Sequence, residues 1–242
     1  MSKQPSKIAR YFSSTNSLLY SYLISLPLLL LYEVLIFIAQ PDSEHVVRIS
    51  VDVWIKTLFS YFGQNVLSIT LILVALIGIF ILYRDREKLS SLRTGYFIGM
   101  FFEAALYAFF LSILITTAVG SLMQVAGPSA VESLPFLQQM ALSLGAGLYE
   151  ELFFRVILVS ALLWMFKHFF TKKAAAYAVA IILAAVIFSL VHYIGALGDS
   201  FTFSSFLFRF LFGLALNAIY IWRGFGMAAW THAIYDLMVL AF

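Results

Sequence analysis

Side chains that can act as acids, bases or metal ligands occur in three apolar stretches of this sequence. They are Glu150, Glu151 and Arg155 in the first stretch, His192 in the second, and His232 with Asp236 in the third. A charged side chain in the core of a bilayer costs ~3 kcal/mol on insertion scales, so such residues are rare and usually functional. Carboxylates and imidazoles can transfer protons or bind a metal ion. The three stretches therefore predict one buried polar site.

The spacing within the first stretch separates its two carboxylates. Glu151 and Arg155 are four residues apart, which is the spacing of a side-chain pair on one helix face. Glu150 is rotated by ~100° from Glu151 and can face a cavity. Gly145 and Gly147 leave room for a neighbouring helix to approach closely. The alternative is a structural salt bridge between Glu151 and Arg155, with Glu150 as a bystander.

The second stretch ends at His192, and a lone histidine there could also be a satisfied helix-end residue or an interface anchor. A basic turn near position 170 joins this stretch to the first. Glu150 lies twenty residues before that position and His192 lies twenty-two residues after it. Two antiparallel helices with the same rise per residue would hold them at about the same depth. Glu150 is therefore predicted to face His192.

The third stretch carries His232 and Asp236 four residues apart, on one helix face, where they could also form a self-contained pair. Asn217, in the preceding stretch, falls near the depth of His232 and is a candidate supporting partner, although a plain interhelical hydrogen bond is its commoner role. The basic loops place His232 nearer the inner membrane surface than Glu150, so two separate halves of the site are predicted. Other intramembrane ions are interpreted as structural partners or polar lining: Glu33, Glu103 and Arg209.

The composition indicates an integral membrane protein. The 242 residues are 63% hydrophobic and 11% charged, with a mean hydropathy of +0.98, whereas a soluble domain is about half apolar and a quarter charged. The predicted fold class is all-α, a polytopic membrane bundle of seven or eight transmembrane helices around a polar cavity. It forms one membrane domain, 1–242, with its motif-bearing core at about 136–242. The seven predicted spans are 17–39, 65–83, 95–120, 136–166, 174–195, 201–222 and 226–242. Val46–Phe62 is interpreted separately as an amphipathic helix that lies on the membrane. The alternative for the fourth run is a re-entrant or surface segment followed by a shorter span.

The basic residues gather at the N-terminus and in the loops after the second, fourth and sixth predicted spans. This pattern predicts a cytoplasmic N-terminus and an external C-terminus. Leu18–Ala39 is too long for the apolar core of a signal peptide, so a retained first span is predicted. The basic residues are too dispersed to indicate a nucleic-acid partner. The chain has no cysteine for a disulfide or a thiol nucleophile.

Three motifs in order on separate apolar stretches resemble a known set. They are Glu-Glu-x-x-x-Arg at 150–155, Phe-x-x-x-His at 188–192 and His-x-x-x-Asp at 232–236. This set is similar to that of the CPBP intramembrane protease family, which includes CAAX prenyl proteases and bacteriocin-processing or self-immunity proteins. The resemblance covers about residues 145–236.

The resemblance implies hydrolysis of a peptide bond by a water molecule that a glutamate activates. By position, Glu150 would be the general base, His192 would help to hold the water, and His232 would lie on the oxyanion side. Many members have asparagine where this chain has Asp236. An ionised aspartate cannot donate a hydrogen bond, so we expect Asp236 to pair with His232 and favour the imidazolium as donor. Residues predicted to support this group are Glu151, Arg155 and Asn217.

Three alternatives stay open. Zinc or manganese held by Glu150, His192, His232 and Asp236 would activate water directly, but there is no His-Glu-x-x-His helix and chemistry without a metal cofactor is favoured. The scaffold could instead serve a non-proteolytic adaptor or bacteriocin immunity protein. A proton-coupled transporter also uses buried Glu and His, although the sequence has no paired halves with broken helices.

The predicted partners are the lipid bilayer and a membrane-anchored or lipidated peptide or protein, in a prokaryotic cell membrane. The sequence assigns neither a particular substrate nor an oligomeric state.

Overall fold

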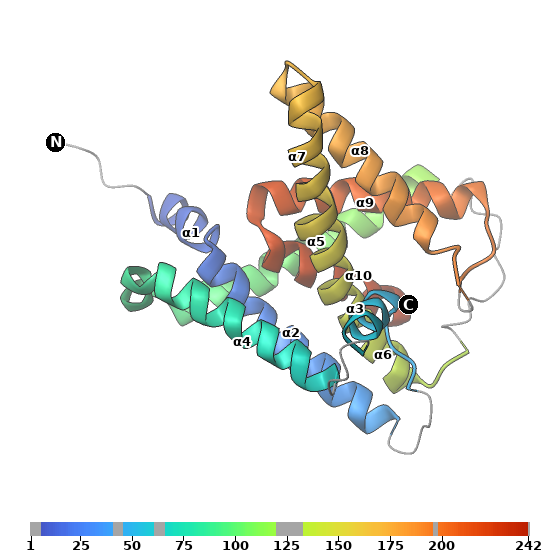
Figure 1. The fold of residues 1–242 in the computed structure, drawn as a ribbon, viewed down its shortest axis with the longest axis horizontal. Helices are drawn as coiled ribbons and strands as arrows, with labels where there is room; N and C mark the ends of the chain where they lie inside the picture. Colours follow the sequence, from blue (N-terminus) through green and yellow to red (C-terminus); the bar gives the residue numbers. More distant parts are fainter. Residues whose placement is uncertain (1–5, 41–45, 61–65, 120–132, 196–197, 242) are drawn as a thin grey trace.

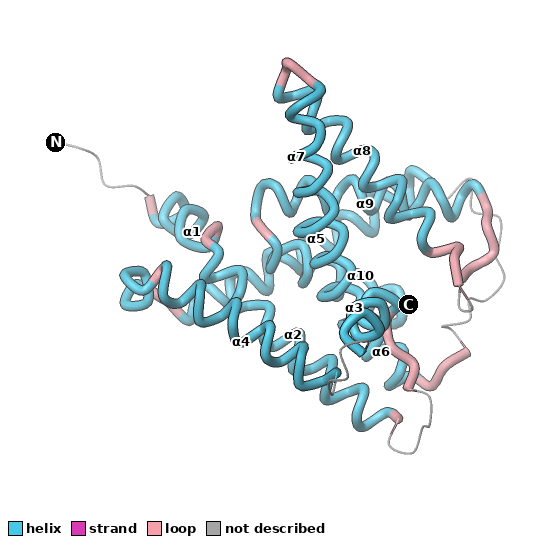
Figure 2. Tube along the Cα trace, in the orientation of Figure 1, coloured by secondary structure: helices cyan, strands magenta, loops and turns pink. Residues whose placement is uncertain are grey.

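The computed structural model describes residues 6–40, 46–60, 66–119, 133–195 and 198–241. These residues form helices joined by short loops, and no strand occurs among them (Figure 2). The helices are α1 Lys7–Thr15, α2 Leu18–Ala39, α3 Ser50–Ser60, α4 Val66–Arg84, η1 Arg86–Ser91, α5 Thr94–Val119, α6 Phe136–Gly145, η2 Ala146–Glu150, η3 Leu152–Val159, α7 Ser160–Phe169, α8 Lys173–Val191, α9 Phe203–Arg223 and α10 Phe225–Ala241. The predicted all-α class is confirmed.

Five helical segments are long and apolar enough to cross a membrane, so the protein is a multi-pass integral membrane protein. They are Leu18–Ala39, Thr94–Val119, Phe136–Phe169, Lys173–Val191 and Phe203–Arg223. Each matches a predicted span. The predicted number of seven or eight is not confirmed. The end residues 65, 120 and 242 of three predicted spans lie outside the described residues.

The remaining two predicted spans are also helices, but they differ from the five. In α4, which has 19 residues, the stretch Thr70–Arg84 is an apolar helix. Helix α10 has 17 residues, and its first half is buried. It packs against α2, α5, α6, η2 and α9 near the centre of the bundle (Figure 1). Many of its apolar side chains therefore contact other helices of the bundle.

The segment from α6 to α7 changes its backbone pattern at the predicted site. It runs without a break from Phe136 to Phe169, and η2 and η3 within it are π-helical. π-Helical turns inside α-helices frequently occur at functional sites. At the end of this segment, α7 forms a hairpin with α8 that projects from the rest of the molecule (Figure 1). The hairpin confirms the turn near position 170 on which the depth of His192 was predicted.

Gly147 allows α10 to cross η2 at very short range. A Cβ atom at this position would lie 2.5 Å from the carbonyl oxygen of Ala229 and 2.6 Å from the Cβ of Ala233. The prediction that a glycine here permits close helix approach is confirmed. Since His232 lies between these two alanines in sequence, the crossing brings its turn of α10 beside the Glu-Glu motif.

Candidate functional site

The predicted site residues gather around one cavity of about 1000 Å³. Its lining includes Glu150 at the end of η2, His192 after α8, and His232 and Asp236 in α10. The rest of the wall is largely apolar and aromatic. Three separate parts of the chain therefore supply polar groups to one partly apolar space, as the sequence predicted.

Glu150, at the end of η2, faces His192, which follows α8. Oε2 of Glu150 lies 3.8 Å from Nε2 of His192, which is too long for a direct hydrogen bond. The other imidazole nitrogen, Nδ1, lies 2.8 Å from the carbonyl oxygen of Phe188. Because a carbonyl only accepts, Nδ1 carries a proton and, in the neutral ring, Nε2 is an acceptor that faces the carboxylate. Both groups also line a smaller cavity of about 40 Å³.

Glu151 joins the two halves of the site that the sequence kept apart. Its Oε1 lies 2.9 Å from Nη1 of Arg155, which confirms the predicted ion pair. The same oxygen lies 2.7 Å from Nδ1 of His232. The opposite nitrogen of His232 lies 3.4 Å from Oδ2 of Asp236. The two motifs lie side by side because α10 crosses the Glu-Glu motif directly at Gly147.

Phe188, in α8, contacts the guanidinium of Arg155 and the two imidazoles of the site. The guanidinium carbon of Arg155 lies 4.5 Å from the centre of its ring, within cation–π range. The ring centres of His192 and His232 lie 4.9 Å and 6.1 Å from it. The sequence motif contained Phe188 but no role was predicted for it, since only the tertiary fold places its ring between three polar residues.

Asn217 lies in the interhelical contact rather than in the cavity wall. Its side-chain amide donates to the carbonyl oxygen of Ile181 in α8, at 3.0 Å. This is the plain interhelical hydrogen bond that the sequence left as an alternative to a contact with His232.

Comparison with known proteins adds one finding. Residues 132–238 match the family model described as type II CAAX prenyl endopeptidase Rce1-like. Over these residues, which make up less than half of the chain, the protein is similar to that CAAX protease family. The matched region contains all three motifs and agrees with the resemblance seen in the sequence. No curated protein and no solved structure matches the chain.

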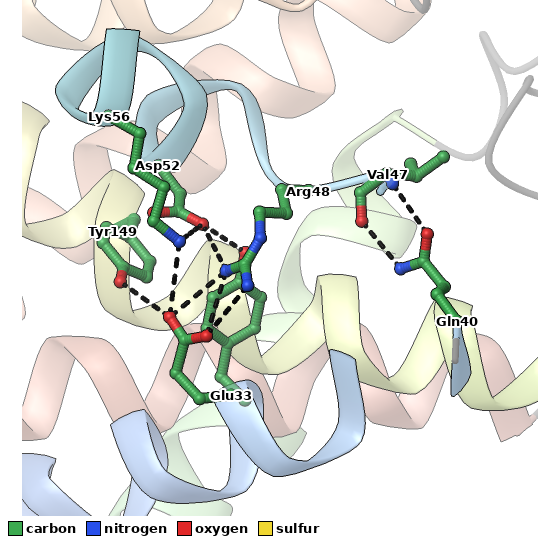
Figure 3. Close-up of polar contacts among 8 residues, drawn as sticks. Glu33, Gln40, Val47, Arg48, Asp52, Lys56 and Tyr149 are labelled. Atoms are coloured by element: carbon green, nitrogen blue, oxygen red, sulfur yellow. Dashed lines mark hydrogen bonds and ion pairs between the residues drawn. The ribbon is translucent and has the colours of Figure 1, made fainter. Parts of the chain in front are cut away.

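An ionic cluster, formed mainly by residues that precede the matched region, ties α3 to α2 (Figure 3). Helix α3 also contributes to the lining of the cavity. Arg48 donates to both carboxylate oxygens of Glu33 and to Asp52, all within 3.2 Å. Lys56 donates to Asp52 at 2.9 Å, and Tyr149 donates to Glu33 at 3.5 Å. Because Tyr149 precedes Glu150, the cluster ties α2 and α3 to the site helix.

The electrostatics of this cluster favour its charged form. Burial opposes the charge of Arg48, but the hydrogen bonds and the charge of Glu33 outweigh it and raise the pKa of the guanidinium above its ordinary value. The sequence predicted Glu33 as a structural partner but missed the cations. Their signal was present, since Arg48, Asp52 and Lys56 follow one another at four-residue steps.

The other two intramembrane ions also have partners. Glu103 pairs with Arg223 at 2.6 Å and accepts hydrogen bonds from Tyr11 and Tyr107, so it joins α1, α5 and α9. Arg209 pairs with Asp199, and both line the cavity. Glu103 is therefore a structural partner, and Arg209 is part of the polar lining.

The residues named for a metal do not form a metal-binding set as they are placed. A catalytic zinc takes three protein ligands that converge on one point. Among the described residues, no three His, Asp or Glu side chains do so. Both nitrogens of His232 face carboxylates instead.

Proposed function

We propose that this protein is a membrane-embedded endopeptidase that hydrolyses a peptide bond of a membrane-anchored or lipidated substrate. Glu150 would activate the attacking water. The observation that carries this proposal is the placement of Glu150 and His192, 3.8 Å apart, on the wall of a large cavity. The family of residues 132–238 supports the same reaction class.

The Glu150–His192 pair suits a water molecule that donates two hydrogen bonds. The carboxylate of Glu150 and the Nε2 atom of His192 both accept hydrogen bonds. Their separation of 3.8 Å is suited to a water molecule that bridges them. Both protons of that water would be engaged, which leaves an oxygen lone pair free to attack the scissile carbonyl. Glu150 would take one proton as the C–O bond forms, and would pass it to the leaving amine as the C–N bond breaks.

His232 would stabilise the negative charge that develops on the carbonyl oxygen. Its ring lies between Glu151 and Asp236, which as carboxylates can only accept hydrogen bonds. Both ring nitrogens would therefore carry protons. The short contact to Glu151 fixes Nδ1, while the longer one to Asp236 leaves the Nε2 proton available to the substrate oxygen. Arg155 would hold Glu151 through their buried ion pair.

The membrane arrangement extends this proposal. Helices α4 and α10 would join the five long segments to make seven membrane-crossing helices in a prokaryotic cell membrane. The basic loops support a cytoplasmic N-terminus and an external C-terminus. The aromatic cavity wall, with Phe188, Phe208 and Phe212, suits an apolar lipid group beside the peptide.

The test is cleavage of a farnesylated peptide that ends in a C-a-a-X sequence, by purified protein in detergent. Mass spectrometry should find cleavage at one bond near the lipidated cysteine, and a strong chelator should leave the rate unchanged. Loss of activity on chelation, restored by zinc, would support the metal alternative. Binding of the peptide without cleavage would favour the adaptor and contradict the proposal.

A further inference from the structure

Arg209 places a positive charge on the wall of the catalytic cavity, close to the segment that follows His192. It lies in α9, and its side chain is 21% exposed. The guanidinium donates to the hydroxyl of Tyr193 at 3.1 Å, and its charge acts on the imidazole of His192. The backbone of Asp199, its ion-pair partner, also donates to the carbonyl oxygen of His192, at 2.9 Å. Arg209 is therefore tied to the segment that follows His192, the proposed water-binding group.

Hydrogen bonds among the described residues engage only some of the N–H groups of the Arg209 guanidinium. Nη1 donates to Tyr193 and to Ser205, and one N–H of Nη2 donates to Asp199. A guanidinium has five N–H groups, so these three bonds within the described part of the chain leave two donors, one on Nε and one on Nη2. The other arginine of the cavity wall differs, because Arg48 meets two carboxylates and its charge is matched within its own cluster (Figure 3).

The expected substrate carries a group that fits these donors. A C-a-a-X sequence stands at the C-terminus of its protein, so any bond within it lies no more than three residues from a free α-carboxylate. Three extended residues span roughly 10 Å. Arg209 lines the same cavity as Glu150 and His192, and its charge acts on the His192 imidazole, so this reach suits a substrate held in that cavity. A guanidinium fork matches a carboxylate in shape and charge.

We propose that Arg209 binds the C-terminal α-carboxylate of the substrate and so selects peptide bonds close to a free C-terminus. The inference rests on the endopeptidase function proposed above. Asp199 would orient the guanidinium and share it with the substrate carboxylate. The side chain acts as a specificity residue, away from the attacking water.

The test compares two lipidated peptides that differ only at the C-terminus, one with a free acid and one with an amide. One charge-assisted hydrogen bond to the substrate changes kcat/KM by roughly 10- to 100-fold. The wild-type protein should therefore have a kcat/KM for the free-acid peptide that exceeds that for the amide peptide by this factor. Arg209→Gln should reduce the ratio of the two kcat/KM values to about one, mainly by slowing cleavage of the free-acid peptide. Arg209→Lys should keep part of the preference, since the charge remains without the fork.

Arg48→Gln is the matched control, because it removes the same charge from the same cavity wall. It should leave the ratio of acid to amide unchanged, whatever its effect on the absolute rate. If Arg209 only pins the segment after His192, Arg209→Gln will slow both peptides equally and the preference will persist, which refutes the inference. If Arg209→Gln does not fold, the ratio measured for Arg209→Lys decides in the same way.

The two proposals fail differently. A wild-type protein that cleaves both peptides at equal rates contradicts the role of Arg209 and leaves the endopeptidase intact. A wild-type protein that cleaves neither contradicts the endopeptidase itself.

Discussion

The crossing of α10 over η2 can be tested by adding one methyl group at Gly147. In Gly147→Ala the new Cβ would lie 2.5 Å from the carbonyl oxygen of Ala229 and 2.7 Å from the backbone nitrogen of Ala233. These are backbone atoms that no side-chain rotation can move. Since comfortable contacts between such atoms are ~3.5 Å, α10 must shift by roughly 0.5–1 Å. His232 would move with it.

The expected change in the stability of Gly147→Ala is the difference between two opposing free energies. Overpacking of this kind costs ~1–3 kcal/mol, and replacing glycine by alanine in a helix returns ~0.5–1 kcal/mol. The variant should therefore lose about 1 kcal/mol of stability, the difference between the middles of the two ranges. A misplacement of 1 Å at a catalytic group can cost ~100-fold in rate, so cleavage should fall by more than the stability loss implies.

The matched control is Gly95→Ala, because a Cβ at Gly95 would meet nothing within 4 Å. Thermal unfolding followed by tryptophan fluorescence in detergent and the kcat for a lipidated peptide should be measured for both variants. Gly147→Ala should unfold at a lower temperature and cleave more slowly than the wild type, while Gly95→Ala should match or exceed it in stability. Identical behaviour of the two variants would refute the close crossing.

Three further substitutions test the contacts around the site. Glu151→Gln should cost ~3–5 kcal/mol, since it leaves the buried guanidinium of Arg155 without its carboxylate; chemical unfolding measures this, and a change below 1 kcal/mol would contradict the pair. Asp236→Asn should alter the pH–rate profile between pH 5 and 8, because it removes one of the two carboxylates beside His232. An unchanged profile would contradict the proposed role of Asp236. Glu33→Gln should loosen α3, raising its hydrogen exchange and the KM for peptide; unchanged exchange would show that the ionic cluster does not hold the helix.

The sequence predicted those contacts that depend on fixed geometry along one chain segment. The four-residue steps of Glu151–Arg155 and His232–Asp236 become contacts because a helix repeats after about four residues. The approach of Glu150 to His192 follows from an equal rise per residue on both sides of one turn.

The contacts that the sequence missed depend on how helices cross. The bond from His232 to Glu151 requires α10 to pass at Gly147, and no spacing within either helix encodes that crossing. The number of spans is not confirmed. Five segments meet the length and hydropathy of a membrane span, whereas the described part of α10 has 17 residues.

The central claim is that Glu150 activates the attacking water. Glu150→Gln keeps the size and the hydrogen-bonding shape of the side chain but removes its capacity to take a proton. We predict that kcat for a lipidated C-a-a-X peptide falls at least ~100-fold, the lower bound for loss of a general base, while the unfolding temperature stays that of the wild type. A folded Glu150→Gln variant that cleaves at the wild-type rate would contradict the account.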